Sequence, residues 1–253
     1  MKKFLLSLGI VLAIMACNQK PDGYTLKGNL TGEVENGTQV FLRKMGDNMQ
    51  PVDIDTTTIE NGQFTFSGAS VDSPEMHFLF VDKLLGYTAV ILENGEVQIT
   101  AHKDSLSGAE TKGAPQNDYF AKYMDNSRAL SKQAMSIQND IQQATMGQDQ
   151  AVLTSLNEEM ADLQEQAQAY ELTYINENPD ALISVLLLER VITSRQLPYE
   201  EVQAMYDGIS PEIKETSAAK KVVEQLEQLK QRAESEKNTE VGAKGSPVFG
   251  SNA

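Results

Sequence analysis

Several residue types that commonly build active sites are scarce in this chain of 253 residues. It has no tryptophan, one cysteine and two histidines, His77 and His102. A zinc site needs a third imidazole or a thiolate beside such a pair, so the histidines do not indicate a metal site. We expect both to lie on the surface of strands, and we predict no metal and no cofactor.

Basic residues are also few, with 21 lysines and arginines against 36 aspartates and glutamates, which gives a net charge of −15. Both signs are spread along the chain, as is typical of a solvated surface. Nucleic-acid binding requires a basic patch, so we exclude nucleic acid as a partner. Hydrophobic residues make up 40% of the chain. This content is enough for a folded core.

Catalytic motifs are missing as well. The chain has no Gly-x-Ser-x-Gly elbow and no glycine-rich phosphate loop. Asp53 and Asp55 alternate on an expected strand and would share one face, where paired carboxylates could bind Ca²⁺ or act as acid and base. Their stretch "VDIDTTTIENG" lacks the spacing of a calcium loop, so we interpret them as satisfying strand and turn hydrogen bonds. We predict that the chain is not an enzyme and has no catalytic residue.

The single cysteine ends an apolar segment at the N-terminus. Lys2 and Lys3 precede "FLLSLGIVLAIMA", an uncharged and mostly apolar run. This run is too short to span a bilayer, which takes roughly 20 helical residues, but it fits the apolar region of a secretory signal. We therefore predict a signal peptide at residues 1–16.

The end of this segment resembles the bacterial lipobox, in which a small residue precedes a cysteine. The residues concerned are Ile14, Met15, Ala16 and Cys17. The resemblance implies cleavage before Cys17, acylation of that cysteine and a membrane as partner. An ordinary signal peptide followed by an incidental thiol is the alternative. With Cys17 lipidated, no thiol remains for a disulfide or a redox pair.

Residues 17–23 are predicted to be a tether, and residues 24–115 a β-rich domain. Asn-Gly pairs at residues 36–37, 61–62 and 94–95 predict two-residue turns. The second pair predicts the clearest hairpin, between "VDIDTTTI" and "QFTFSG". Roughly seven short strands without intervening helices favour an antiparallel sandwich or barrel.

Residues 116–236 have a helical period. Apolar or small residues recur in alternating steps of four and three, first over residues 130–144 and again over 153–174. Between these runs, Gly147 suits a left-handed cap and Asp149 an N-cap, so we predict a hairpin of two long helices. One unbroken helix is the alternative, because a single glycine costs only about 1 kcal/mol.

Three further helices are expected after this hairpin. Asn178 and Pro179 would begin the first, which is apolar nearly all round over residues 181–192 and should be buried. Residues 198–208 form a short helix, and a last one begins near Ser210. The expected apolar stripe of the last helix consists of Val222, Val223, Leu226 and Leu229. The fold class is α+β with segregated parts: a β-sandwich or barrel-like domain, then an all-α domain.

The outline resembles the N-terminal part of bacterial lipoproteins that usually carry a C-terminal thioredoxin-like, thiol-disulfide oxidoreductase domain. "YTLKGNLTG", "VDIDTTTIENGQFTFSG" and "ILENGEVQITA" are similar to their β-rich domain of unknown function, over about residues 22–115. "ENPDALISVLLLERV" is similar to a piece of their helical segment. The tail at residues 237–253 is similar to the linker that enters the thioredoxin-like domain, which is absent from these residues together with its reactive cysteines.

These observations predict a non-catalytic, lipid-anchored envelope lipoprotein that binds or positions an unknown protein partner. The resemblance implies the cell envelope of a Gram-negative bacterium. In lipoproteins of this kind an aspartate after the lipidated cysteine retains many at the inner membrane, so the resemblance, with Asn18 at that position, favours the outer membrane. One alternative is the front part of a thioredoxin-like oxidoreductase. Another is a structural envelope component that oligomerises through its helices.

Overall fold

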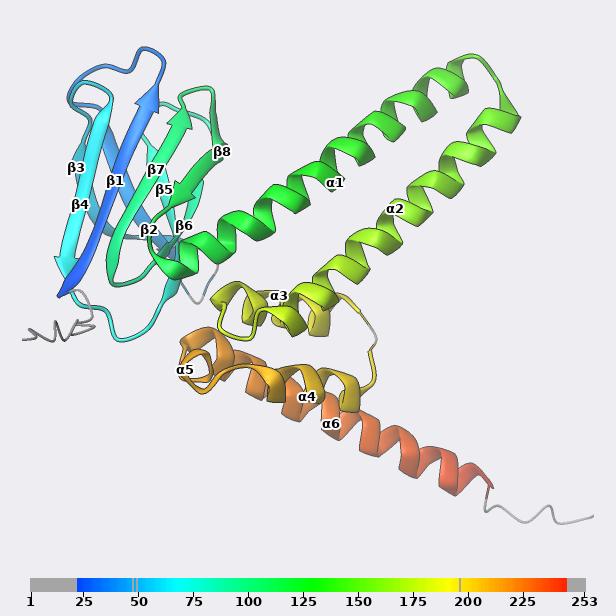
Figure 1. Ribbon diagram of the computed structural model, residues 1–253. Coiled ribbons are helices and arrows are strands. Elements are labelled where there is room, and N and C mark those ends of the chain that lie inside the picture. The colour runs from blue at the N-terminus through cyan, green and yellow to red at the C-terminus, as the bar shows by residue number, and fades with distance from the viewer. Residues whose placement is uncertain (1–21, 47, 49, 196, 245–253) are drawn as a thin grey trace, which may run out of the picture.

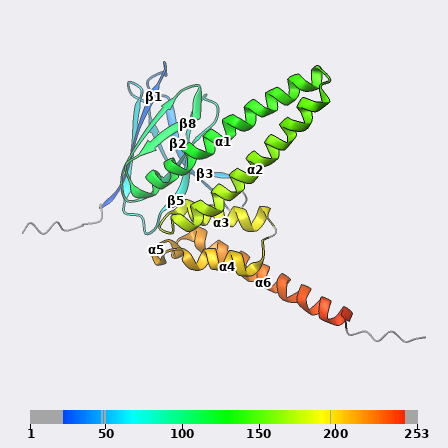
Figure 2. The ribbon, with the colours of Figure 1, turned by 45° about the vertical axis from the view of Figure 1, so that its right-hand side comes forward.

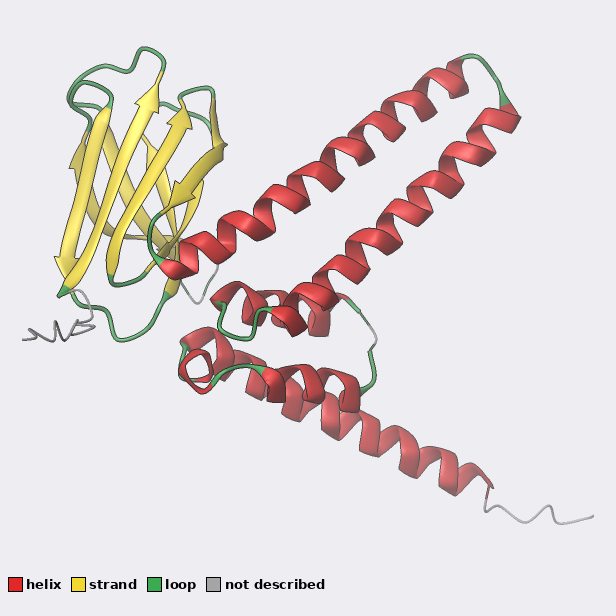
Figure 3. Cartoon of the chain, in the orientation of Figure 1, coloured by secondary structure: helices red, strands yellow, loops and turns green. Residues whose placement is uncertain are grey.

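A computed structural model describes residues 22–46, 48, 50–195 and 197–244. The expected signal peptide, the lipobox residues Ile14, Met15 and Ala16, the lipidation site Cys17 and the tail from residue 245 lie outside the described residues. Within them, eight strands are followed by six helices (Figures 1 and 3). The predicted α+β class, with segregated strands and helices, is confirmed.

The strands form two four-stranded sheets that pack as a sandwich and do not close into a barrel. The first sheet has the order β4 (Gln63–Ala69), β1 (Gly23–Thr31), β7 (Gly95–His102) and β8 (Ser105–Lys112). The second has the order β3 (Pro51–Thr58), β2 (Gln39–Met45), β5 (Glu75–Val81) and β6 (Thr88–Leu92). All neighbours are antiparallel except β1 and β7, which are parallel.

Alternation of apolar and polar residues builds the core between the sheets. In β7, Val97, Ile99 and Ala101 point inward while the residues between them are exposed. Phe64 and Phe66 of β4 likewise face inward, and both are buried. Strand β8 was not expected, because its sequence has little apolar alternation. Among residues 105–110, only Leu106 and Ala109 have apolar side chains that reach the core.

The three Asn-Gly turns connect different sheets, which corrects the predicted hairpins. They join β1 to β2, β3 to β4 and β6 to β7, and each pair is split between the two sheets. At residues 61–62 the chain does reverse, and Glu60 bridges to Gln63. The preceding residue, Ile59, is fully buried between the sheets, so β3 turns away to pair with β2. Turn chemistry determines the local reversal but not the partner strand.

The predicted helical hairpin is confirmed. Helices α1 (Pro115–Met146) and α2 (Gln150–Glu177) lie side by side and project away from the sandwich in both views (Figures 1 and 2). Asp149 caps α2, because its Oδ1 accepts the N–H of Val152 at 3.2 Å. The left-handed residue is Gln148 with φ 54°, and not Gly147, which keeps a helical φ of −78°.

Asn178 ends α2 instead of beginning the next helix, which corrects its expected role. Its Nδ2 donates to the carbonyl oxygen of Tyr174 at 2.9 Å. Helix α3 (Leu182–Ser194) begins after the turn that contains Pro179. It is buried over most of its length, as predicted, and forms the centre of the helical core.

Helix α4 (Tyr199–Gly208) agrees with its prediction, but the last helix is divided into α5 (Pro211–Lys214) and α6 (Ser217–Lys244). The hydroxyl of Thr216 accepts the N–H of Ala219 at 3.2 Å and so starts α6 anew. Val222 and Leu226 pack inward as expected, whereas Val223 is 47% exposed. Helix α6 continues to Lys244, beyond the expected start of the linker. Adding residues to an existing helix costs little, which accounts for this extension.

Candidate functional site

Asp53 and Asp55 lie on opposite faces of β3, which corrects the expected shared face. Asp53 pairs with Arg43 and Asp55 with Leu42, and β3 carries one extra residue between these pairs. Neighbouring residues of β2 point to opposite faces, so this bulge separates the carboxylates. Asp53 accepts from Nε of Arg43 at 2.5 Å and Asp55 from the N–H of Thr56 at 2.7 Å. Both therefore satisfy strand hydrogen bonds, as interpreted from the sequence.

The two histidines differ in exposure. His102 is exposed as expected, but His77 is only 2% exposed, which corrects its predicted surface position. His77 shares the inward face of β5 with Leu79 and Val81, and its Nδ1 lies 3.1 Å from the carbonyl oxygen of Glu75. Both faces of β5 are rich in apolar residues, so periodicity alone did not reveal the inward one.

Within the described part of the chain, no three histidine, cysteine or acidic side chains lie close enough together to hold a metal ion. The candidate residues Asp53, Asp55, His77 and His102 therefore do not gather into such a group. A larger concave feature lies elsewhere in the described residues, at the boundary between strands and helices.

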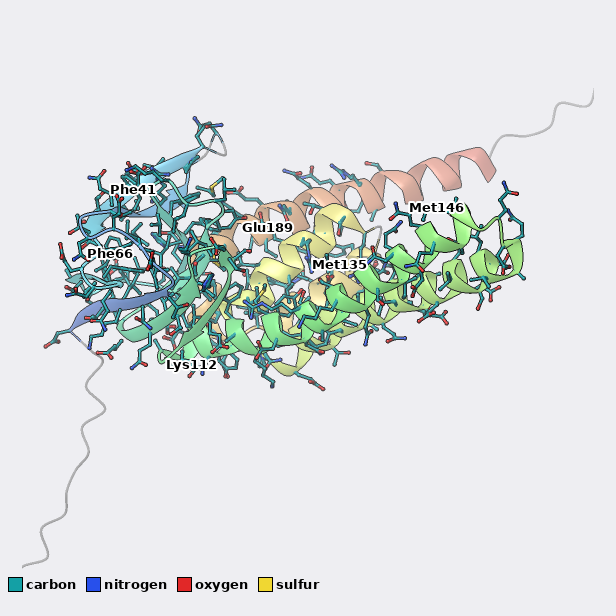
Figure 4. The ribbon with its side chains drawn as sticks, turned by 90° about the horizontal axis from the view of Figure 1, so that it is seen from above. Phe41, Phe66, Lys112, Met135, Met146 and Glu189 are labelled. Atoms are coloured by element: carbon teal, nitrogen blue, oxygen red, sulfur yellow. The ribbon has the colours of Figure 1, made fainter. Side chains whose placement is uncertain are left out.

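A groove of about 850 Å³ runs between the sandwich and the helices. Strands β6 and β8 line one side, and α1 with the end of α2 lines the other; Lys112 marks the β8 side, near the start of α1 (Figure 4). Its apolar lining includes Ala89, Ala109, Phe120 and Met124. Its exposed charged lining includes Glu110, Lys112, Lys122 and Asp125. Ligands commonly bind in concave surfaces of this size that combine apolar and polar side chains, so the groove is the candidate functional site.

Side chains from neighbouring elements occupy the outer edge of β8. Arg128 of α1 donates from Nη2 to the carbonyl oxygen of Ala109 at 2.9 Å. Thr88 of β6 donates from Oγ1 to the carbonyl oxygen of Leu106 at 2.7 Å. An open strand edge pairs readily with another chain, and contacts of this kind cover part of such an edge. Arg128 and Thr88 therefore occupy two backbone acceptors of β8 beside the groove.

Three tyrosines pack together at the α1–α2 end of the groove. The ring centroids of Tyr123, Tyr170 and Tyr174 lie 5.3 to 5.9 Å apart. Burial raises the pKa of Tyr174, whose hydroxyl donates to the carbonyl oxygen of Tyr119 at 2.7 Å. Edge-to-face and stacked rings attract one another, so this cluster stabilises the packing of α1 against α2.

Asn117, near the start of α1, connects the helices to the sandwich and is fully buried. Its Oδ1 accepts the N–H of Ile91 at 3.0 Å, and its Nδ2 donates to the carbonyl oxygen of Ile91 at 2.6 Å. The same Nδ2 and the backbone N–H of Asn117 each donate to Oε1 of Glu93 at 2.9 Å. Asn117 thus pairs with the end of β6 much as a neighbouring strand would.

The preceding residue, Gln116, makes hydrogen bonds to the backbone at the start of α3. Its Nε2 donates to the carbonyl oxygen of Asp180 at 2.8 Å, and its Oε1 accepts the N–H of Leu182 at 2.7 Å. We call Gln116 and Asn117 the amide clamp. It attaches both β6 and the start of α3 to the first turn of α1, and it therefore holds together the elements that surround the groove.

Glu93 is expected to make the free energy of unfolding depend on pH. Burial raises the pKa of this carboxyl above its ordinary 4.5, although hydrogen bonds from Gln116 and Asn117 oppose the shift. Its stabilising contribution is therefore present below pH 4.5 and is lost as the pH rises through the folded-state pKa. Glu93→Gln keeps an acceptor oxygen but cannot ionise. Urea unfolding at a series of pH values should show Glu93→Gln gaining stability relative to wild type above pH 4.5.

Glu96→Gln is the matched control. Glu96 is exposed, and the hydrogen bond from Lys27, at 2.5 Å, lowers its pKa. A lowered pKa contributes stability that is present above the unfolded-state value and is lost as the pH falls through the folded-state value. Glu96→Gln should therefore lose stability relative to wild type as the pH rises. A pH trend of the same sign in both variants would contradict the role assigned to Glu93.

The groove and the amide clamp were both missed in the sequence. Asn117 lies in "PQND", a polar run of the kind that begins many helices. The charged groove residues are spaced along helix and strand like ordinary surface residues. Only the approach of β6, β8 and α1 brings them together, so no local pattern could have identified them.

In the described range, no helix combines the length and the apolar character that crossing a membrane requires. No curated protein and no solved structure matches this chain. A family model does match residues 24–120, which comprise the sandwich and the start of α1. The expected N-terminal domain of unknown function is thereby confirmed, whereas the link to a thioredoxin-like domain stays a prediction. The family is described as a domain of unknown function (DUF4369).

Proposed function

We propose that this chain is a non-catalytic, lipid-anchored lipoprotein of the Gram-negative cell envelope that binds a protein partner in the groove between β8 and α1. The observation that carries the binding role is the groove of about 850 Å³ itself. Its apolar lining can take up side chains, and its charged lining has both signs. A polypeptide segment carries the same mixture of groups.

The amide clamp supports this role because it holds the groove in one shape before a ligand arrives. Within one turn of α1, Asn117 makes hydrogen bonds to the sandwich and Gln116 makes hydrogen bonds to the helical part; we call these two parts the modules. A site that is already ordered loses less conformational entropy on binding. The two modules would then act as one rigid receptor.

The proposed anchor is Cys17, after cleavage of the signal peptide. Stable anchoring takes more than one acyl chain, and the lipobox resemblance implies such multiple acylation. We assign the anchor to the outer membrane, following Asn18. Anchoring would hold the groove at the membrane surface and present it to partners in the envelope.

Photo-crosslinking in the native host tests the binding role. A benzophenone amino acid replaces Lys122, which is exposed in the groove, or Lys132, which is exposed farther along α1 and outside the groove. We expect a discrete protein adduct from position 122 and none from position 132. Adducts of equal yield from both positions, or from neither, would contradict the groove as the binding surface.

The same cells test the anchor. Wild type should carry a fatty-acid label and remain in the membrane fraction, while Cys17→Ser should lose the label and leave that fraction. A wild-type chain without label would contradict the anchor and leave the crosslinking result to decide the binding role.

A further inference from the structure

The tripeptide Glu-Asn-Gly occurs three times, at residues 35–37, 60–62 and 93–95. In an Asn-Gly pair the glycine nitrogen can attack the side-chain carbonyl carbon of asparagine, which forms a cyclic succinimide and releases ammonia. Water then opens the ring to aspartate or isoaspartate, so no enzyme, oxidant or reductant is required. Because the tripeptide is the same each time, differences in rate must arise from the surrounding structure.

Both the oxygen and the nitrogen of the Asn94 side-chain amide make hydrogen bonds. Its Oδ1 accepts the N–H of Val71, and its Nδ2 donates to the carbonyl oxygen of Val71, both at 2.8 Å. The residue is also partly buried. Turning its carbonyl carbon toward the nitrogen of Gly95 would break both hydrogen bonds, so the folded protein protects this site.

Asn36 is exposed but partly engaged. Its Oδ1 accepts the N–H of Asn61 at 2.8 Å. The attacking group is also engaged, because the N–H of Gly37 donates to the carbonyl oxygen of Ile59 at 2.8 Å. Reaction here requires loss of one hydrogen bond on each reacting group.

At Asn61, neither of the two reacting groups is restrained by a hydrogen bond to another described residue. The residue is exposed, and among the described residues neither its side-chain amide nor the N–H of Gly62 has a hydrogen-bond partner. We propose that Asn61 is a site of spontaneous deamidation and isoaspartate formation, that Asn36 reacts more slowly, and that Asn94 is protected.

The position of Asn61 gives the modification a structural consequence. The turn joins β3 to β4 across the two sheets, and the carbonyl oxygen of Gly62 accepts the N–H of Leu30 at 2.7 Å. Isoaspartate adds a methylene to the main chain and moves that carbonyl away from β1. It also displaces the N–H that bonds to Asn36, so conversion at Asn61 should accelerate the later conversion of Asn36.

The test incubates the folded full-length chain in mildly alkaline buffer made with heavy-oxygen water, followed by peptide mapping and isoaspartyl methylation. Asn61 should convert at least roughly tenfold faster than Asn94, because Asn94 must first lose two hydrogen bonds. In strong urea the three sites should convert at similar rates. Equal rates in the folded protein, or rate differences that persist in urea, would overturn the proposal.

Asn61→Gly is the companion variant. The backbone at this position has a left-handed φ of 53°. Glycine tolerates that conformation, keeps the N–H and cannot deamidate. In this variant Asn36 should convert at a constant slow rate, without the late acceleration expected in wild type. Late acceleration in Asn61→Gly would refute the coupling between the two turns.

Discussion

Replacing Asn117 with leucine is expected to lower the free energy of unfolding by about 3 kcal/mol or more. The asparagine side chain is fully buried and makes three hydrogen bonds, to Ile91 and Glu93. Leucine has nearly the same size but would leave the N–H and C=O of Ile91 without these partners. Buried polar groups without partners are among the costliest local defects in a fold.

The loss should also weaken the connection between the two modules. Ile91 packs with the helical core, whereas its neighbours Val90 and Leu92 pack in the sandwich core. Without the bond from Asn117, we expect the single urea transition to broaden or divide into two. Circular dichroism, which follows the helices, and proteolysis between β8 and α1 would together measure this change.

Asn176→Ala is the matched control for Asn117→Leu. Asn176 lies exposed on α2, and its Nδ2 donates to the carbonyl oxygen of Leu172 at 2.9 Å. Loss of this exposed bond should change the free energy of unfolding by less than about 0.5 kcal/mol. A result for Asn117→Leu as small as this control would refute the amide clamp as the link between modules.

Replacing Gly28 with valine is expected to destabilise the sandwich by about 3 kcal/mol. Gly28 interrupts the apolar alternation of β1 and pairs across the sheet with Phe64 of β4. A Cβ on residue 28 would lie only 1.9 Å from Cζ of Phe64, so the ring occupies the space that any side chain would need. Phe64 is itself buried and packs edge-on against Phe66, with ring centroids 6.0 Å apart, so it cannot move without disturbing the core.

A double-mutant cycle identifies the cause of this loss. Phe64→Ala alone should cost about 4 kcal/mol because it leaves a cavity. Combined with Gly28→Val, the total should fall short of the sum by at least about 1 kcal/mol, since the valine fills part of that cavity. Strictly additive losses in urea unfolding would show that the ring does not exclude a side chain at residue 28.

Gly208→Ala serves as the control for Gly28→Val. An added Cβ at residue 208 would meet nothing within 4 Å. This substitution should therefore be neutral or slightly stabilising, because alanine restricts the unfolded chain more than glycine does. A comparable loss in both variants would point to a general backbone effect and not to the aromatic ring.

Local sequence patterns were enough to predict the order and kind of most elements in the described part of the chain. Alternation in stretches such as "QFTFSG" predicts strands, because side chains of a strand point to opposite faces. The steps of four and three over residues 130–174 predict two packed helices, because such steps place apolar groups on one side. The apolar run at residues 181–192 predicts a buried helix, because a helix that is apolar nearly all round must be covered by other elements. These patterns depend on local geometry, which every segment carries in its own residues.

Which elements contact one another could not be predicted from such local patterns. The Asn-Gly pairs determine where the chain turns, but the burial of Ile59 between the sheets directs β3 toward β2 and away from β4. A bulge in β3 separates Asp53 from Asp55, and the inward face of β5 buries His77. The groove and the amide clamp likewise require β6, β8 and α1 to come together from distant parts of the chain. Such contacts depend on the competition of all segments for one core, which no single stretch of sequence expresses.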